Sequence, residues 1–523
     1  MAERGETAEP GESAPPRGAA VVLLVAMAVA SVCGLVYELL AGALSSYLLG
    51  SSVTEFSLVV GIFLSAMGVG SWLSQHVRGS LVAAFVAVEL LVGVVGGVIG
   101  VAGFAAFALT SAYRVVLLGL VIATGVLIGL EVPLVVRILQ HRTQLRVSVA
   151  NVLSADYLGA LFGSLLFPFV LVPEAGLIRA GLLAGLANVG VGWITLWLLR
   201  EAIGRSLRPL VAGATAATAL LGGLLVFAQP LSAALEQELY QDDVILTRDS
   251  QYQKITITRW RDDIRLYLDG NLQFSSVDEY RYHESLVHPA LSLVPHARRV
   301  LVLGGGDGLA AREILKWGPD EVVIVDLDPE ITRLFRDRPI LAAINGRSLH
   351  DPRVRVVNTD AMGFLADGTD AWDVIIADLP DPNTLAVGKL YSRQFYRLAL
   401  KRLSRQGVFV TQATSPFETR AAFWCIVHTL RAVEPRGGGT LHVAPYTTHV
   451  PSFGEWGFVL ASERAIEPAA MHMGVETRYV TPEVVQRMFV FGKDTAEVDS
   501  PVNDLDDQPL VRLYEEGYKR FYD

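Results

Sequence analysis

Long apolar stretches separated by short polar breaks fill the first part of the chain, from Ala19 to Ala228. Most stretches have about the 20 residues that a helix needs to cross the hydrocarbon core of a bilayer. The pattern predicts a multi-pass α-helical membrane domain over residues 19–228, with about seven helices at 19–49, 54–75, 80–106, 113–139, 151–173, 176–199 and 208–228. Small residues inside them, as in "GVVGGVIGVAG", allow close helix packing. Residues 1–18, rich in Pro, Gly and Glu, predict a disordered tail.

After Pro230 the pattern changes to that of a soluble protein. The segments "QKITITRW" and "DIRLYLDG" alternate apolar and polar residues around "RDD", which predicts a small β-hairpin subdomain over residues 240–297. From Arg298, apolar runs such as "RRVLVLG", "EVVIVD" and "WDVIIAD" alternate with helical stretches, as in a parallel sheet covered by helices. We therefore predict a doubly wound α/β, Rossmann-like domain over residues 298–465 and a C-terminal extension over residues 466–523.

Composition and net charge limit the kinds of molecule that the protein is expected to bind. The hydrophobic content of 52% supports a membrane part, and the net charge of −10 without clusters of Lys and Arg argues against a nucleic-acid partner. An acidic protein suits a cationic small molecule better. The two cysteines, Cys33 and Cys425, exclude a disulfide framework and a zinc site built from cysteines.

Four acids lie within or near the predicted spans: Glu38, Glu89, Glu131 and Asp156. Ionisable groups at membrane depth are costly, so these acids have either a direct function or a structural, paired role. Arginines are concentrated in the N-terminal tail and in the even-numbered connections between the predicted helices. Because positively charged connections stay in the cytoplasm, this distribution places the N-terminus inside the cell and everything after Ala228 outside.

A glycine-rich turn joins a strand to a helix in "LVLGGGDGLAAREILKW", residues 301–317. Gly304, Gly305 and Gly306 allow a ligand to approach the backbone, but their spacing differs from the dinucleotide fingerprint, and Asp307 would repel a pyrophosphate. We expect a nucleotide ligand without phosphates. Asp326 ends the next strand about twenty residues on, where an acid accepts hydrogen bonds from a ribose diol.

Further acids follow two later strands. Asp360, followed by Ala361, stands where a carboxylate can accept from an adenine amino group. Asp378 and Asp381 lie three residues apart in the proline-stiffened turn "ADLPDP". Two fixed carboxylates suit either a metal or the two ammonium groups of a diamine, and the absence of His or Cys near them in the sequence favours the diamine.

These motifs resemble those of the polyamine aminopropyltransferases, the spermidine synthase family. The resemblance covers residues 250–462 and rests on "SQYQKI", "LYLDGNLQFSSVDEYRYHESLVHPAL", "VLVLGGGDGLAAREILKW", "VVIVDLDPEI", "DVIIADLPDP" and "KLYSRQFY", in the family's order and spacing. The apolar first half is similar to the long, membrane-attached branch of that family. The implied fold of the second half is that of the S-adenosylmethionine-dependent methyltransferases.

The resemblance implies transfer of an aminopropyl group from decarboxylated S-adenosylmethionine, a co-substrate, to a diamine such as putrescine, giving spermidine and methylthioadenosine without a cofactor or metal. On the donor side it implies that Gln253 and Asp326 hold the nucleoside, that Asp360, next to Ala361, binds the adenine, and that Asp307 binds the aminopropyl ammonium. It also implies that the glycine loop lies against the donor.

On the acceptor side the resemblance implies that Tyr252 and His283 line the path of the amine, with Asp307 and Asp381 binding ammonium groups and Asp378 acting as catalytic base. The family also implies a possible homo-oligomer.

Several residues depart from the family's pattern. Leu379 and Pro380 replace small hydroxyl residues, Leu385 replaces a proline, Ala361 replaces a glycine, and Phe453 stands where many members have an acceptor-binding tyrosine. A different diamine or a longer polyamine therefore stays open as acceptor.

Two other functions remain as alternatives. The membrane acids suit polyamine cations, so the chain is alternatively a membrane polyamine transporter or sensor with a synthase-like soluble domain. A methyltransferase would need the carboxylate-bearing donor, which Asp307 opposes. We expect a multi-pass protein of the cell membrane. The side of its catalytic domain stays open, because donor supply indicates the cytoplasm and the arginines indicate the exterior.

Overall fold

The computed structural model describes residues 19–49, 52–110, 112–140, 144–294, 296–435 and 439–522. The chain divides into two compact units, Met1–Asp242 and Asp243–Asp523. The predicted tail, residues 1–18, lies outside the described residues.

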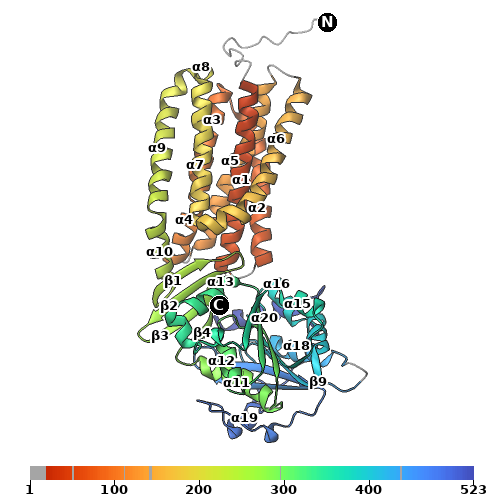
Figure 1. Cartoon of the computed structure of the whole chain (residues 1–523). Coiled ribbons are helices and arrows are strands. Elements are labelled where there is room, and N and C mark those ends of the chain that lie inside the picture. The colour runs from red at the N-terminus through yellow and green to blue at the C-terminus, as the bar shows by residue number, and fades with distance from the viewer. Residues whose placement is uncertain are drawn as a thin grey trace, which may run out of the picture. The chain divides into compact units, whose positions relative to one another are not determined.

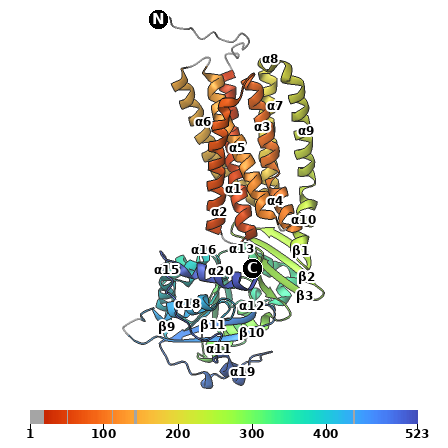
Figure 2. The same ribbon diagram turned by 180° about the vertical axis from the view of Figure 1, so that it is seen from behind.

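The first unit is a bundle of long helices (Figures 1 and 2). Its main helices are α1 (Ala19–Leu49), α2 (Ser52–Leu73), α3 (Leu81–Gly97), α4 (Ile99–Leu109), α5 (Tyr113–Leu139), α6 (Leu145–Leu166), α7 (Val172–Leu198), α9 (Leu207–Val226) and α10 (Ala228–Leu239), with the short α8 (Arg200–Ile203) before α9.

Glycines bring these helices into backbone contact, as the small residues predicted. A Cβ atom at Gly129 of α5 would lie 2.1 Å from the carbonyl oxygen of Met67, and one at Gly70 of α2 would lie 2.0 Å from that of Val126. The helices α2 and α5 therefore cross at a distance that only glycine allows.

Six helical stretches are long and apolar enough to cross a membrane, where the sequence predicted about seven. The difference arises because residues 151–173 and 176–199 belong to one stretch, Leu145–Leu198. Helical hydrogen bonding continues between them through a π-helical turn, Phe167–Leu171. At Gly176 the backbone is not helical, with φ 73°, so this stretch of 54 residues is kinked into two helices.

The second unit begins with a four-stranded antiparallel sheet in the order β1-β2-β3-β4. The strands are β1 (Asp243–Asp249), β2 (Lys254–Trp260), β3 (Asp263–Leu268) and β4 (Asn271–Ser275). The predicted hairpin is β2–β3, whose turn holds Arg261 in the left-handed region at φ 56°. The prediction of a single hairpin included too few strands, because β1 and β4 extend the sheet on both sides.

A seven-stranded sheet follows, in the order β10-β11-β9-β8-β5-β6-β7. Its parallel strands are β5 (Arg299–Gly304), β6 (Glu321–Asp326), β7 (Val354–Asn358), β8 (Trp372–Asp378) and β9 (Leu403–Gln412), and β11 (Gly454–Ser462) runs antiparallel between β9 and β10 (His442–Val450). This order confirms the predicted Rossmann-like fold of the methyltransferase type.

Helices cover both faces of this sheet because successive residues of each strand point to opposite faces. Val300 and Val302 pack on one side with α11 (Glu279–Ser292), α12 (Leu309–Leu315) and α13 (Pro329–Asp337). Leu301 and Leu303 pack on the other with α15 (Ala361–Asp367), α17 (Arg393–Lys401) and α18 (Arg420–Arg431).

The segment after β11 is part of this core rather than an appendage. It contains α19 (Pro482–Met488) and α20 (Pro509–Tyr522). Val485 packs with the first face of the sheet, and Leu510 of α20, fully buried, packs with the second. The region predicted as a C-terminal extension thus completes both layers.

Candidate active site

The carboxyl ends of β5, β6 and β8 meet where the order of the strands reverses, which is the usual place for a ligand in an open α/β sheet. Gly304 pairs with Asp378 in the register of β5 and β8. A Cβ atom at Gly304 would lie 2.0 Å from the carbonyl oxygen of Asp378, and one at Gly306 would lie 2.6 Å from Oδ2 of Asp326. The glycines therefore bring the loop against both acids.

Asp326 is held by backbone N–H groups. The amide of Gly306 donates to its Oδ2 at 2.9 Å and the amide of Asp328 to its Oδ1 at 2.8 Å. Burial raises the pKa of Asp326 to about 6, although these two bonds lower it. The half-buried carboxylate has further lone pairs for a diol, as predicted for a ribose.

Gln253 reaches the same region through Asp328. Its Nε2 donates to Oδ2 of Asp328 at 3.0 Å, and the Ser250 hydroxyl donates to the same oxygen at 2.7 Å. Asp328 also caps α13 by accepting from the amide of Glu330. This acid fixes the turn between β1 and β2 against the end of β6, a structural role that the sequence analysis did not assign.

Asp360 is engaged at both oxygens. It caps α15, which starts at the buried Ala361, by accepting from the amide of Gly363 at 2.8 Å, and Lys389 Nζ donates to Oδ1 at 2.8 Å. Burial raises the pKa of Asp360, but the bond and charge of Lys389 leave it below its usual value. Lys389 competes with the predicted adenine contact, and no motif in the sequence indicates this ion pair.

His283, Glu279 and Arg312 form a charged network. His283 Nδ1 contacts the backbone oxygen and Oε2 of Glu279, both at 2.9 Å, so Nδ1 carries a proton. Glu279 in turn accepts two bonds of 2.9 Å from Arg312. Burial lowers the pKa of His283, but the bond and charge of Glu279, with the charges of Asp378 and Asp307, raise it to about 9.

The charge of His283 lowers the pKa of two acids, Asp307 and Asp378. Burial raises the pKa of Asp307 to about 6, with His283 lowering it and Asp378 raising it. Burial also raises the pKa of Asp378, which His283 lowers in the same way. Asp307 and Asp378 are thus electrostatically coupled to His283, and both are half-buried. Three of the predicted site residues are therefore linked to one another by charge.

Tyr282 supplies the phenol at this site. Its hydroxyl donates to Oδ1 of Asp378 at 2.8 Å. Burial raises the pKa of Tyr282 well above its usual value, and the charges of both Asp378 and Asp381 add to the rise. Tyr252, the predicted tyrosine, is 45% exposed in the turn between β1 and β2, and its role stays a prediction.

Asp381 is bound from two elements that the sequence analysis did not connect. Tyr514 of α20 donates to its Oδ2 at 2.8 Å, and Gln412 Nε2, at the end of β9, lies 3.4 Å from its Oδ1. Gln412 also donates to the carbonyl of Leu379 at 2.9 Å and contacts the Tyr391 hydroxyl. Burial raises the pKa of Asp381 to about 6, although the bonds from Tyr514 and Gln412 lower it.

Phe453 lies in an aromatic cluster beside Tyr282. Its ring centroid is 6.3 Å from that of Tyr282 and 5.1 Å from that of Trp456. An apolar ring here can contact a methylene chain but offers no hydroxyl to an amine.

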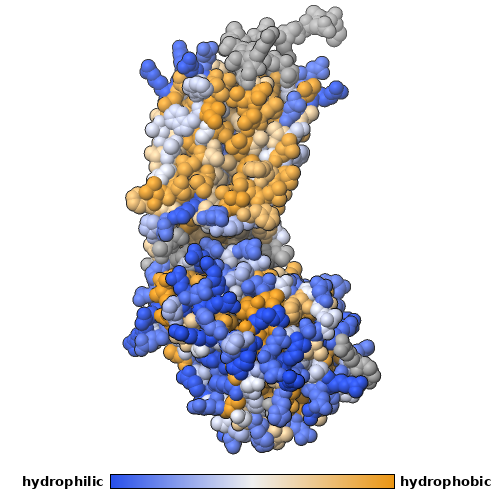
Figure 3. Space-filling view, viewed as in Figure 1, coloured by the Kyte–Doolittle hydropathy of each residue, from blue (hydrophilic) through white to orange (hydrophobic). Residues whose placement is uncertain are grey.

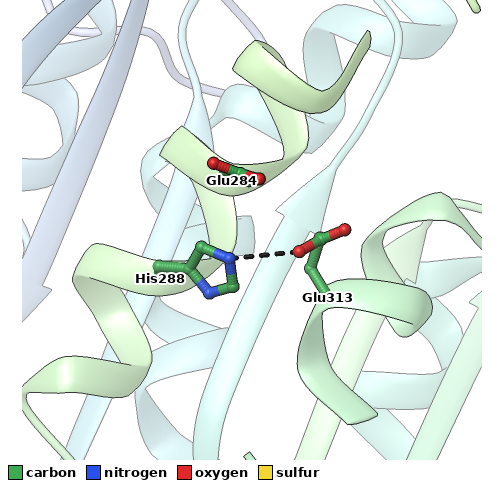
Figure 4. A group of neighbouring side chains, drawn as sticks. All are labelled: Glu284, His288 and Glu313. Carbon is green, nitrogen blue, oxygen red and sulfur yellow. Dashed lines mark hydrogen bonds and ion pairs between the residues drawn. The ribbon is translucent and has the colours of Figure 1, made fainter. Parts of the chain in front are cut away.

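Among the residues that the structure describes, one group outside this site has ligand types suited to a metal: Glu284, His288 and Glu313, all buried, with ligand atoms within 4.8 Å of one another (Figure 4). Glu284 accepts from three backbone amides, at residues 478–480. Trp317 donates to Nδ1 of His288, so Nε2 of His288 carries the proton and donates to Glu313 at 3.1 Å. With its ligand nitrogen protonated, the group fits a hydrogen-bonded contact between α11, α12 and the C-terminal segment, and not a metal.

The four acids of the helical unit differ in their surroundings. Asn188 donates to Glu89 at 2.7 Å, and the Ser31 hydroxyl donates to Asp156. Glu38 is half-buried. Glu131 is fully buried, and neither of its carboxylate oxygens has a hydrogen-bond partner among the described residues. Paired roles thus account for two of the four.

Comparison with known proteins gives four findings. Residues 279–469 match the family model described as the spermine/spermidine synthase domain. Over 514 residues the chain is 48% identical to polyamine aminopropyltransferase 2 of Ralstonia nicotianae, covering 96% of this chain and 99% of the relative. It is 41% identical over 502 residues to the polyamine aminopropyltransferase of Leptospira interrogans, covering 96% and 99%. The solved structure of spermidine synthase from Thermotoga maritima, 26% identical, aligns with 48% of this chain and 85% of its own at a TM-score of 0.43.

Proposed function

This chain belongs to the polyamine aminopropyltransferases, a family of transferases that use decarboxylated S-adenosylmethionine as co-substrate and need no cofactor, and on that premise we propose its substrates. The acceptor is putrescine, and the products are spermidine and methylthioadenosine. The comparisons give no support to the alternative of a membrane transporter or sensor.

The observation that carries this proposal is the gathering of Asp307, Asp378 and Asp381 around two groups. Tyr282 donates to Oδ1 of Asp378 at 2.8 Å, and the charges of Asp378 and Asp381 both raise the pKa of its phenol. The charges of Asp378 and Asp307 raise the pKa of the neighbouring His283. A site with three acids attracts an aminopropyl ammonium and a diamine that carries two positive charges.

The reaction is a displacement at carbon. The amine nitrogen attacks the aminopropyl carbon next to the sulfonium, the carbon–sulfur bond breaks, and its electron pair stays on sulfur as a neutral thioether. The attacking amine must first lose a proton, and Asp378, whose pKa burial raises, accepts it. Tyr282 fixes the carboxylate by its bond to Oδ1, and orientation of the two substrates supplies the rest of the acceleration.

Asp307 selects the donor. The amide of Leu309 donates to its Oδ1 at 2.8 Å and fixes the carboxylate at the start of α12. S-adenosylmethionine carries an α-carboxylate beside its amine, which would face this acid across a partly desolvated gap, whereas the decarboxylated donor offers only an ammonium.

The helical unit, we propose, lies in the cell membrane. Six of its helical stretches are long and apolar enough to cross a membrane. Apolar side chains cover most of the surface that this unit shows in Figure 3. On α6, large side chains are exposed in a row that suits lipid and not water: Tyr157, Leu158, Leu161, Phe162 and Leu165. The supply of donor favours a catalytic unit on the cytoplasmic side. Digestion of this unit by protease added to intact cells would instead support the side indicated by the arginines.

The proposal is tested by incubating the purified full-length protein with decarboxylated S-adenosylmethionine and a panel of amines, with products identified by mass. We expect spermidine from putrescine, and a fall of at least about a hundredfold in kcat for Asp378→Asn, as for loss of a positioned base. Equal turnover by Asp378→Asn and the parent protein would contradict the assignment of the base. Preference for another amine would contradict only the choice of putrescine as the acceptor.

A further inference from the structure

The C-terminal helix α20 lies outside the residues that match the family model, 279–469, yet it reaches the candidate active site. Its Tyr514 is 9% exposed, and the Tyr514 hydroxyl donates to Oδ2 of Asp381 at 2.8 Å. A residue 133 positions further along the chain thus contacts a carboxylate proposed to bind the acceptor.

Packing fixes this helix and its tyrosine. A Cβ atom at Gly517 would lie 2.8 Å from the Cα atom of Thr419, so α20 crosses the start of α18 at a distance that only glycine allows. Leu510, one turn before Tyr514, is fully buried in the core, and the ring of Tyr518 lies 4.9 Å from that of Tyr514. The phenol therefore has little freedom to leave Asp381.

The two oxygens of Asp381 are held unequally. Oδ2 accepts the short bond from Tyr514, whereas Oδ1 has Gln412 Nε2 at 3.4 Å, beyond the usual range of 2.7–3.2 Å for such a bond. Gln412 directs its better bond to the carbonyl of Leu379. One oxygen is thus anchored, and the other is left weakly bound and available to an ammonium group.

We propose that Tyr514 is a positioning residue for the acceptor: it fixes the rotation of the Asp381 carboxylate so that Oδ1 faces the terminal ammonium of the diamine. The C-terminal helix is then part of the acceptor site. This inference rests on the proposed function, because it takes Asp381 as the group that binds the amine. It assigns acceptor affinity, and not the chemical step, to the Tyr514 hydroxyl.

The test compares full-length Tyr514→Phe with the parent protein by steady-state kinetics and by calorimetric titration with putrescine. Removing the hydroxyl keeps the ring and its packing, and one bond to a charged group accounts for roughly a tenfold effect or more. We expect KM and Kd for putrescine to rise about tenfold, with kcat and the KM for the donor within about twofold of the parent.

Tyr446→Phe is the matched control. Tyr446 is also buried, and its hydroxyl donates to the Ser285 carbonyl at 2.9 Å and not to Asp381. We expect it to lower stability without raising the KM for putrescine. If both variants change kcat and both KM values alike, Tyr514 is merely structural and the inference is overturned.

A double-mutant cycle with Asp381→Asn gives a second, independent outcome. If Tyr514 acts through Asp381, the double variant binds putrescine no more weakly than Asp381→Asn alone. Additive losses overturn the inference. If the parent protein transfers the aminopropyl group and Tyr514→Phe binds putrescine as tightly as the parent, this inference is wrong but the proposed function stands. A parent protein that neither transfers the group nor binds putrescine contradicts the proposed function as well.

Discussion

Tyr282 donates a hydrogen bond of 2.8 Å to Oδ1 of Asp378, from the first turn of α11 to the end of β8, 96 residues away in the chain. The neighbouring His283 points its Nδ1 to Glu279 instead, and its charge lowers the pKa of the same Asp378. Two consecutive side chains therefore control one carboxylate, the first by a hydrogen bond and the second by charge.

Loss of the Tyr282 hydroxyl should impair catalysis. In Tyr282→Phe the Asp378 carboxylate loses a bond to a charged acceptor, which is worth about 1.5–3 kcal/mol. We expect kcat/KM for putrescine to fall about ten- to a hundredfold. The control is Tyr479→Phe, which removes a hydroxyl that lies 2.8 Å from the Thr448 hydroxyl. Equal kinetics for Tyr282→Phe and Tyr479→Phe would show that the bond to Asp378 has no catalytic role.

The charge of His283 should be visible in the pH dependence of activity. Because His283 lowers the pKa of Asp378 and of Asp307, His283→Gln leaves both acids with a higher pKa. Asp378 must be ionised to accept a proton, so we expect the acidic limb of log kcat against pH to move to higher pH in this variant. Glu279 and Arg312 also face His283, and their mutual bonds remain in the variant. An unmoved or acid-shifted limb would contradict the role of the imidazolium.

Binding of the acceptor should weaken in acid. Burial raises the pKa of Asp381 to about 6, so its carboxylate becomes neutral as the pH falls through 6 and loses its attraction for an ammonium group, while the amine stays charged. We expect KM for putrescine to rise below pH 6 in the parent protein. In Asp381→Asn, KM should be high at every pH and should rise less between pH 7 and pH 5 than in the parent protein, because only Asp307 and Asp378 still titrate. A KM that rises equally in both proteins would assign the effect to another group.

Most of the second unit could be predicted from the sequence, because its strands are continuous apolar runs and its acids follow them directly. Asp326 and Asp378 were found in this way, since the carboxyl ends of parallel strands meet at one edge. Contacts made by distant segments left no such signal. Tyr514 lies in an amphipathic helix that looks like any surface helix until its partner, Asp381, is known.

Two other differences have local causes. Tyr282 stands beside the predicted His283 in "EYRYHES", and only the start of α11 decides which tyrosine meets Asp378. Six apolar stretches are found instead of seven because the helix continues through the π turn Phe167–Leu171, and the kink at Gly176 bends the stretch Leu145–Leu198 without ending it.

Asp307→Asn should relax the choice of donor. The variant keeps the shape of the side chain but loses its charge, and with it a charge-assisted bond to the aminopropyl ammonium. We expect kcat/KM for decarboxylated S-adenosylmethionine to fall at least about tenfold, and S-adenosylmethionine, tested as a competitive inhibitor, to bind more tightly than it does to the parent protein. If the inhibitor binds more weakly to the variant, repulsion by Asp307 is not the source of selectivity.

Alanine substitutions at two glycines of similar backbone conformation distinguish the cost of backbone strain from the cost of a steric clash. Gly304 has φ 83° and Gly270, in the turn between β3 and β4, has φ 81°, so an alanine at either position incurs about 1–2 kcal/mol of backbone strain. Around Gly270 a Cβ atom meets nothing within 4 Å, whereas at Gly304 it would lie 2.0 Å from the carbonyl oxygen of Asp378.

We therefore expect Gly270→Ala to lower the free energy of unfolding by no more than about 2 kcal/mol and to leave kcat within about twofold of the parent protein. Gly304→Ala should cost more than about 3 kcal/mol, because the end of β8 must move away from β5. Any folded Gly304→Ala protein should lose activity at least about tenfold, since Asp378 moves with its backbone. Thermal unfolding and kcat measured on both variants check the difference. Equal losses would mean that the close contact of Gly304 with Asp378 does not position the base.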